Sequence, residues 1–343
     1  MRKKLALILV GILMLALLVG CSQPADDTNN EPEPAEPVSV NLAVGDPIHS
    51  SVGVTAEYFA RRVAEETDGR VEVTVFPDGT LFGGDQNAAV SMLEDGSLDA
   101  MILSTSVFAS FEKKMNAISL PYLFSGYDEF VGFLEGEPGQ ELLASFDNQN
   151  SKGLALMIRT FRSVTNSRGP IAEPADLEGL KLRVPNNKLW VEFFGPMGAD
   201  PTPMDFGEVY TSLQLGTIHG QENPVEVPLA NKFYEVQDYL SLTNHIADAY
   251  ALVFNKDLWD SFDAETQEIL ERVALETAQF KLDSDLAEEE EVIAELEEKG
   301  MQVNRLTEEQ VAAFQEAALE LYPKFEELVG KEFMEKTLDF LGR

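Results

Sequence analysis

The chain has 343 residues, of which 25 are Lys or Arg and 60 are Asp or Glu, so its formal net charge is −35. Nucleic acids and anionic membrane surfaces bind cationic faces and are therefore poor partners for the surface of this protein. With 44% hydrophobic residues, the chain exceeds what one core usually fills, which favours two domains that need no disulfides.

The N-terminus resembles a secretory signal. Three basic residues precede an apolar run over residues 5–19, which is short for a membrane span but typical of a signal peptide. The run ends in LVGC, which resembles a bacterial lipobox and holds the only cysteine, Cys21. We expect cleavage before Cys21 and lipidation of its thiol. The alternative is an ordinary signal, or a single anchor, with an incidental cysteine.

The stretch SQPADDTNNEPEPAEP follows the cysteine and has almost no large apolar residue. Such a composition cannot contribute to a core, so we expect an extended, solvated tether. The folded body is expected to begin near Val38 and to work outside the cytoplasm.

Further along, helical segments alternate with strand-like runs. Ala56, Phe59 and Val63 follow helical spacing, Gly69 supplies a stop, and VEVTVF then alternates with period two. This alternation predicts an α/β fold with helices on both faces of its sheets. Further helices are expected in AAVSMLED, YDEFVGFLEG and EVYTSLQLG, and further strands in LDAMILS, GLALMIRTF, KLRVP, AYALVFN and QVNRL, before a capping box of Thr307 and Gln310 opens a last helical region.

Residues 263–299 contain neither glycine nor proline and are rich in Ala, Leu, Glu and Gln, which predicts one long helix. At about 1.5 Å per residue it would reach roughly 55 Å, enough to brace two domains. Two helices with a break near residues 283–285 are the alternative. The run DSDLAEEEE lacks the glycine and the ligand spacing of a calcium loop.

Motifs for catalysis are missing from the sequence. The three histidines, at positions 49, 219 and 245, are too far apart for a metal motif of the HExxH type. No nucleophile elbow, phosphate-binding loop or dinucleotide fingerprint occurs. We therefore expect no enzymatic activity, no metal and no cofactor.

The scarce cations gather between residues 159 and 188, where six basic residues accompany three acidic ones. In KLRVP, period-two alternation places Lys181 and Arg183 on one face of a strand that Pro185 ends. An arginine at a strand end lies where α/β proteins bind ligands, and its planar fork suits a carboxylate. Pairing with the protein's own acids is the alternative for any one of these arginines.

Several stretches form an ordered set that covers the chain from about residue 40. They are EYFARRVAEETDGRVEVTVFPDGTLFGG, LEDGSLDA, LPYLFSGYDEF, TNSRGPI, ADLEGLKLRVP, GADPTPMDFGEVYTSLQLGTIHGQENP and FYEVQDYLSLTNH. The set resembles the solute-binding proteins of tripartite ATP-independent periplasmic (TRAP) transporters, the DctP-like family. The resemblance implies a two-domain clam-shell of the periplasmic-binding-protein type, with a long helix spanning both domains.

The resemblance also implies four ligand-binding residues. Arg183, in KLRVP, matches the arginine that forms the main ion pair with the ligand carboxylate, and Arg162, in FRSVTNS, matches a second arginine near that group. Asn223, in GQENP, matches an asparagine that hydrogen-bonds the same carboxylate. Phe206, in PMDFGEVY, matches an aromatic wall of the pocket.

Asn186, just after the strand, and His245, in TNH, are further candidates for the site. Arg159 and Arg168 match no position of this kind, so we expect them at the surface or in structural roles. His219 stands where the family commonly has an acid beside the site, as HGQENP in place of DGQENP. It would either make binding respond to pH or occupy an inert surface position.

The first domain is less informative. FGGD replaces a shorter family turn, which leaves the alignment of Gln86 open, and Ser104 follows the strand LDAMIL where sialic-acid binders tend to carry a glutamate. Sialic acid is therefore disfavoured.

The predicted protein is an extracytoplasmic, lipid-anchored solute-binding protein that captures a C4-dicarboxylate or related carboxylate and delivers it to TRAP permease subunits. A ligand-sensing subunit for a membrane receptor is the alternative, and an extracytoplasmic hydrolase is a third hypothesis. The predicted parts are a signal peptide over 1–20, the lipidated Cys21 with its tether to 37, domain I over 38–160 plus about 248–285, and domain II over 161–247 plus about 286–343.

The lipobox generates a direct prediction. Intact-mass analysis of the protein extracted from membranes should show Cys21 as the first residue, carrying acyl chains, because a single acyl chain gives only marginal anchoring and stable anchoring takes two signals. An unmodified Cys21, or cleavage at another position, would contradict it.

Overall fold

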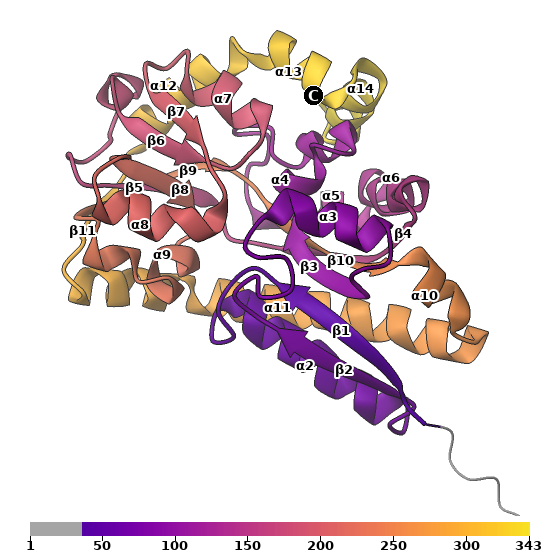
Figure 1. Ribbon diagram of the computed structural model, residues 1–343. Helices are drawn as coiled ribbons and strands as arrows, with labels where there is room; N and C mark the ends of the chain where they lie inside the picture. The colour runs from indigo at the N-terminus through magenta and orange to yellow at the C-terminus, as the bar shows by residue number, and fades with distance from the viewer. Residues whose placement is uncertain (1–35) are drawn as a thin grey trace, which may run out of the picture. The chain divides into compact units, whose positions relative to one another are not determined.

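Strand β1 (Val38–Val44) begins where the tether is expected to end, and its inward side chains are buried from Val40 onward. The computed structural model describes residues 36–343; the predicted signal peptide, Cys21 and nearly all of the predicted tether lie outside this range. Residues 37–343 form one unit built from two mixed sheets with helices packed around them (Figure 1).

The first sheet has the strand order β2-β1-β3-β10-β4. β1 pairs in parallel with β2 and β3, whereas β10 lies antiparallel between β3 and β4. The other strands of this sheet are β2 (Val71–Phe76), β3 (Ala100–Ser104), β4 (Ser151–Ile158) and β10 (Ala249–Asn255).

The second sheet has the order β11-β9-β5-β8-β6-β7. β6 pairs in parallel with both β7 and β8, and β5 lies antiparallel between β8 and β9. Its strands are β5 (Arg162–Asn166), β6 (Lys181–Val184), β7 (Asp200–Pro203), β8 (Gly220–Asn223), β9 (Tyr239–Ile246) and β11 (Gln302–Arg305).

The helices begin at the side chains that the sequence offers as caps. The hydroxyl of Ser50 accepts the backbone N–H of Gly53 at the start of the first helix, and Thr307 and Gln310 form the predicted capping box. The α-helices are α2 (Ser51–Glu66), α3 (Gln86–Glu94), α4 (Thr105–Phe108), α5 (Tyr127–Glu135), α6 (Glu137–Ser145), α7 (Lys188–Phe194), α8 (Val209–Gln214), α9 (Glu226–Ala230), α10 (Lys256–Ser261), α11 (Ala264–Glu298), α12 (Glu308–Leu319), α13 (Tyr322–Val329) and α14 (Lys331–Phe340). Short 3-10 turns are η2 (Lys113–Ala117), η3 (Phe146–Gln149), η4 (Pro174–Leu177), η5 (Phe206–Glu208) and η6 (Phe233–Glu235).

The chain crosses between the sheets at two neighbouring points. β4 leads through residues 159–161 to β5 of the second sheet, and β9 leads back through residues 247–248 to β10 of the first. The backbone N–H of Arg159 donates to the carbonyl oxygen of Asp248 at 3.1 Å. The two crossing segments are therefore hydrogen-bonded to each other.

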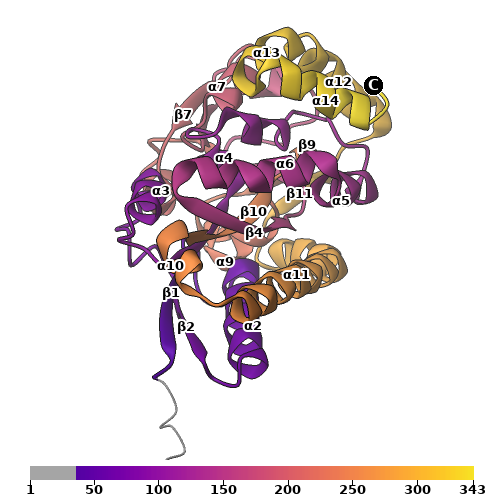
Figure 2. The ribbon, with the colours of Figure 1, turned by 90° about the vertical axis from the view of Figure 1, so that its right-hand side faces the viewer.

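The long helix α11 is a third connection and is continuous over 35 residues, so the alternative of two helices is wrong. It contacts β4 of the first sheet and β11 of the second, as well as the helices α2 and α9. Figures 1 and 2 show it passing along both sheets. Leu270 and Val273 are buried in the core beneath the first sheet, whereas Ile293 and Leu296 are buried against β9. One helix thus belongs to two hydrophobic cores.

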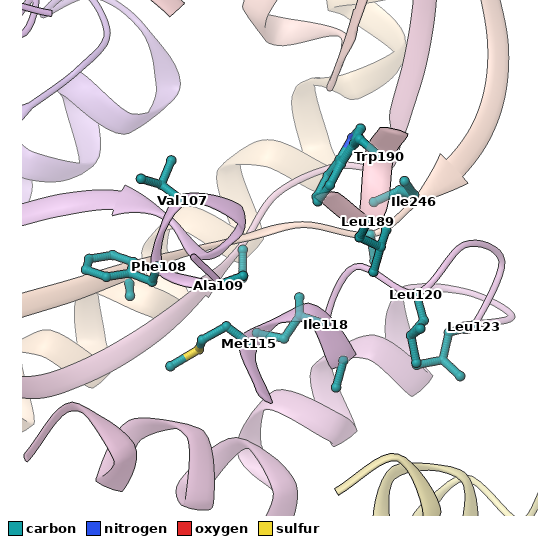
Figure 3. Packing of buried hydrophobic residues seen from close by; sticks show 14 of the residues in the cluster. Val107, Phe108, Ala109, Met115, Ile118, Leu120, Leu123, Leu189, Trp190 and Ile246 are labelled. Carbon is teal, nitrogen blue, oxygen red and sulfur yellow. The ribbon is translucent and has the colours of Figure 1, made fainter. Parts of the chain in front are cut away.

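The largest hydrophobic cluster also joins segments attached to both sheets. Figure 3 shows Leu189 and Trp190 of α7 close to Ile246 of β9, with Leu120 and Leu123 of the segment after η2 in the same cluster. These side chains are almost completely buried. The packing fixes α7, and with it the indole ring of Trp190.

The predicted alternation of helices and strands is confirmed, with one exception. The run GLALMIRTF is not one strand, because β4 ends at Ile158 and the chain then crosses to β5. The predicted domain boundaries stay a prediction, although strands within 38–158 and 249–255 form one sheet and those within 162–246 and 302–305 form the other. Among residues 36–343, no helix combines the length and the apolar character needed to cross a bilayer.

Two lysine–aspartate pairs at i,i+4 spacing predict a contrast in stability. Lys281 in α11 is fully buried and its Nζ lies 2.6 Å from Asp285, whereas Lys256 in α10 makes the same pair with Asp260 at the surface. Lys281→Ala would leave a buried carboxylate without its partner and should cost about 3 to 5 kcal/mol in urea unfolding. Lys256→Ala is the control and should leave the urea midpoint nearly unchanged, because a solvent-exposed pair contributes little. Equal losses in the two variants would contradict the prediction.

Candidate ligand-binding site

A polar cavity lies where parallel strands of both sheets end. Asp46 follows β1, Ser104 ends β3, Arg183 lies on β6, and Asn223 ends β8. The carboxyl ends of parallel strands are the usual place for ligands in α/β proteins. The cavity is lined by Asp46, Gln86, Ser104, Ser106, Arg159, Arg162, Arg183, Pro185, Phe206, Asn223 and Tyr250.

Arg183 is the cation of the cavity without an acidic partner. Its Nε and Nη2 both donate to the carbonyl oxygen of Met204, at 3.0 and 2.7 Å, and its guanidinium lies 5.8 Å from the ring centre of Phe206. The side chain is 3% exposed, and no carboxylate among residues 36–343 lies within 4.0 Å of its nitrogens. Burial lowers the pKa of Arg183 to about 10, although Glu222 opposes this shift.

Arg162 is held by two carboxylates. Its Nε and Nη2 form a bidentate pair with Glu222 at 2.6 and 2.7 Å, and its Nη1 donates to Asp248 at 2.9 Å. The guanidinium lies over the ring of Trp190, 5.5 Å from its centre. Burial alone would raise the pKa of Glu222, but Arg162 and then His245 bring it down to about 2.

Arg159 was expected at the surface or in a structural role, but it is buried and lines the cavity. Its Nη1 donates to Asp248 at 2.9 Å and its guanidinium lies 4.3 Å from the ring centre of Tyr250. Its Nε is buried without a hydrogen bond and lies 3.9 Å from Glu226. Burial acts to lower the pKa of Arg159, but Tyr250 and the nearby carboxylates of Asp248, Glu226 and Asp46 raise it above its ordinary value.

Asp248 connects these arginines to the first sheet. Its carboxylate accepts hydrogen bonds from Arg159 and Arg162, and also from the hydroxyls of Ser104 and Thr105. The residue is fully buried. A buried carboxylate is tolerated when it is paired and hydrogen-bonded in this way.

The chain matches a known family over most of its length. The model of the bacterial extracellular solute-binding protein, family 7 (DctP), aligns with residues 43–328. The chain belongs to this family. The family is a class of solute-binding proteins, whose members include periplasmic proteins.

Relatives of this family 7 protein have named ligands. It is 35% identical to the 2,3-diketo-L-gulonate-binding periplasmic protein YiaO of Escherichia coli, over 73% of this chain and 76% of the relative. It resembles the sugar acid binding protein of Advenella mimigardefordensis, solved with galactonate, at 29% identity and a TM-score of 0.85, over 89% of this chain and 98% of the other. It also resembles a TRAP periplasmic solute-binding protein of Sulfurospirillum deleyianum, solved with succinate, at 28% identity and a TM-score of 0.83, over 88% and 99%. The chain is therefore a TRAP-type solute-binding protein.

Four of the residues predicted for this family 7 protein come together at the cavity, namely Arg183, Arg162, Asn223 and Phe206. Asn223 is buried, and its Nδ2 donates to Gln221 at 2.6 Å. The start of β8 admits only glycine, because a Cβ at Gly220 would lie 2.4 Å from the carbonyl oxygen of Thr165.

Asn186 and His245 lie outside the lining of the cavity. The Nδ2 of Asn186 donates to Asp205 at 2.7 Å, and the Nε2 of His245 lies 3.1 Å from Glu222, behind the bidentate pair with Arg162. His219 is also outside the lining, and its Nδ1 accepts the backbone N–H of Lys181 at 3.1 Å. These three side chains therefore contact other groups of the protein and do not line the cavity.

Sequence reasoning missed Asp46, Ser106 and Tyr250. A signal for the first was present, since Asp46 comes directly after the apolar strand β1 and such positions face ligands. Ser106 follows Ser104 into the short helix α4, and Tyr250 reaches the cavity because β10 pairs its position with Ser104. The register between β10 and β3 joins segments that are distant in sequence, so no local pattern predicts it.

The pair between Glu222 and Arg162 predicts a pH-dependent stability. The pKa of Glu222 is about 2 in the folded protein and 4.5 ordinarily, so the pair stabilises the fold above pH 4.5 and loses this effect as the pH falls toward 2. Glu222→Gln should cost about 3 kcal/mol at pH 7, and its difference from the parent should shrink below pH about 4.5. Urea unfolding from pH 7 to pH 3 measures this.

The control is Glu295→Gln, which removes a surface carboxylate 3.6 Å from Lys299 and should cost less than about 0.5 kcal/mol throughout. A gap between parent and Glu222→Gln that stays constant down to pH 3 would show that the carboxylate charge of Glu222 is not what holds Arg162.

Proposed function

We propose that the protein captures an organic acid outside the cell by pairing its carboxylate with Arg183. The observation that carries this proposal is a buried guanidinium without an acidic partner, beside two arginines that both have one. An unpaired buried charge is costly, so a cavity that contains one favours a ligand of opposite charge. The relatives solved with galactonate and succinate agree with a carboxylate ligand.

The neighbouring groups suit the same ligand group. Arg183 donates the N–H of Nε and one N–H of Nη2 to Met204, which leaves Nη1 and the second N–H of Nη2 to bind the carboxylate as a fork. Asn223 supplies amide hydrogen-bonding capacity, Arg162 adds positive charge, and Phe206 forms a wall at the guanidinium. Asn186 and His245 act in this proposal through Asp205 and Glu222, and not by contact with the acid.

The cavity supports binding in preference to turnover. The acids next to its arginines, Asp248 and Glu222, are engaged as partners of cations, and the pKa of Glu222 is far below the range of a general acid or base at neutral pH. All three histidines are described, and none lines the cavity. A solute-binding role therefore fits better than the hydrolase considered from sequence.

The proposed partners follow from the family. A TRAP-type solute-binding protein delivers its solute to membrane permease subunits, and we propose the same for this chain. Lipidation of Cys21 would hold the protein at the outer face of the cytoplasmic membrane or in the periplasm, with residues 22–37 as a tether. A sensing role for a membrane receptor would use the same bound state.

Arg183→Ala should weaken binding of the acid by about 3 to 5 kcal/mol, more than a hundredfold, because the ligand carboxylate loses its partner. Arg183→Lys should recover only part of the affinity, since an ammonium cannot reproduce the bidentate fork. Calorimetric titration with the best acid from a thermal-shift screen measures both variants, after each has been shown to be folded.

The control is Arg168→Ala, because Arg168 is exposed, lies outside the cavity and donates to the carbonyl oxygen of Gly179. It should bind nearly as the parent does. Binding by Arg183→Ala within threefold of the parent, or stabilisation of the parent by neutral sugars alone, would sink the proposed function.

A further inference from the structure

When the ion pairs around the cavity are counted, two charged residues of its lining remain without a partner. Arg159 and Arg162 are balanced by Asp248 and Glu222, which contact them at 2.6 to 2.9 Å, while Glu226, 3.9 Å from Arg159, lies outside the lining of the cavity. These four side chains are buried and together carry no net charge. Any imbalance in the cavity must come from its remaining charged residues.

The remaining charges stand on opposite walls. Arg183 lies on β6 of the second sheet, and Asp46 follows β1 of the first. Within residues 36–343, neither has an oppositely charged side-chain atom within 4.0 Å. The cavity therefore has a positive end and a negative end.

The hydroxyl groups near Asp46 donate their protons to other oxygens of the protein. Tyr250 donates its hydroxyl to Asp46 at 3.3 Å, and Ser104 donates its hydroxyl to Asp248 at 2.9 Å. Ser106 lies 2.6 Å from Ser104 and must then be the donor of that hydrogen bond. The Ser104 oxygen also accepts the backbone N–H of Ser106 at 3.2 Å, so both of its lone pairs are used. The hydroxyl oxygens of Tyr250 and Ser106 and the carboxylate of Asp46 therefore offer lone pairs to the cavity, and hydrogen-bond donors complement lone pairs.

We infer that the solute is a monocarboxylate with hydroxyl groups along its chain, of the aldonate type. Its carboxylate binds Arg183, and its hydroxyls donate to Asp46 and to the oxygens of Ser106 and Tyr250. Asp46 is the residue that excludes dicarboxylates. The inference rests on the proposed function, since it takes Arg183 as the anchor, and it narrows the C4-dicarboxylate or related carboxylate expected from sequence.

A second carboxylate would be unfavourable beside Asp46 for two reasons. It has no proton to donate to the acceptor-rich wall, and it repels the carboxylate already there. Burial already raises the pKa of Asp46, even though Arg159 opposes the shift, so this wall accommodates one negative charge with difficulty.

A ligand ammonium group would also donate, but Arg159 disfavours it. The Arg159 guanidinium already occupies a face of the Tyr250 ring, 4.3 Å from its centre, where a cation would otherwise find an aromatic surface. An ammonium at Asp46 would find that face of the ring already occupied, whereas a neutral hydroxyl does not depend on it.

The test compares acids that differ in one terminal group. Galactonate and galactarate have the same six carbons and end in a hydroxymethyl group and a carboxylate respectively, and erythronate and meso-tartrate form the same pair at four carbons. Calorimetric titration of the parent should show the better aldonate binding at least tenfold more tightly than its aldarate partner. Succinate and 4-aminobutyrate test an acid without hydroxyls and an acid with an ammonium group.

Asp46→Asn should lower the affinity for the aldonate at least tenfold and reduce its advantage over the aldarate to less than threefold, because the amide can donate to a carboxylate. The control is Asp78→Asn, which removes an exposed carboxylate from the turn whose backbone N–H donates to the carbonyl oxygen of Asp46. Its positive φ of 58° is one that asparagine tolerates, so this variant should keep the parent's preference.

The outcomes separate the inference from the proposed function. Equal or tighter binding of an aldarate, succinate or 4-aminobutyrate by the parent, or an unchanged preference in Asp46→Asn, overturns the inference, while loss of that binding in Arg183→Ala would still uphold the proposed function. If neither these acids nor any acid of the thermal-shift library binds, both fall together.

Discussion

The buried carboxylate of Asp248 is the contact on which the site depends. It lies in one of the two segments that cross between the sheets, and its backbone carbonyl accepts the N–H of Arg159 in the other. The same residue binds the guanidinium groups of Arg159 and Arg162 and the hydroxyls of Ser104 and Thr105. Asp248 thus joins the two crossing segments and orients Arg159 and Arg162, because a buried carboxylate must keep its donors.

This arrangement explains how a very acidic protein presents a positive charge to an anion. Charges at the surface are screened beyond roughly 8 Å at physiological salt, so the acids of the exterior act little on a buried guanidinium. Inside, two carboxylates are used up by two arginines, and Arg183 is left with only the carbonyl oxygen of Met204. The buried, unpaired guanidinium is unfavourable in the empty protein. Pairing it with a ligand carboxylate removes this unfavourable free energy and so favours binding.

Local patterns were enough for the elements and for part of the site. Period-two and period-3.6 alternation located most helices and strands, and KLRVP marked Arg183 because it lies at the end of a strand. Asn223, in GQENP, was marked by the family resemblance, and the structure places it at the end of β8. Alternation failed at Arg183 in one respect, since both faces of β6 are buried at its carboxyl end and the expected polar face is not solvated. Arg159 and Tyr250 escaped prediction, because their positions depend on where β4 stops and how β10 is registered against β3, which are set by contacts distant in sequence.

The two ends of the cavity come from different sheets, and this has a consequence for selectivity. Arg183 moves with β6, whereas Asp46 moves with β1, so the distance between the groups that hold the head and the tail of a ligand is fixed by how the sheets are held together. The crossing segments and α11 determine that distance, because both connect the sheets and α11 is buried in a core at each end. The chemical class of the acid is therefore selected by the side chains of the cavity, while its length is selected by how the crossing segments and α11 hold the sheets together.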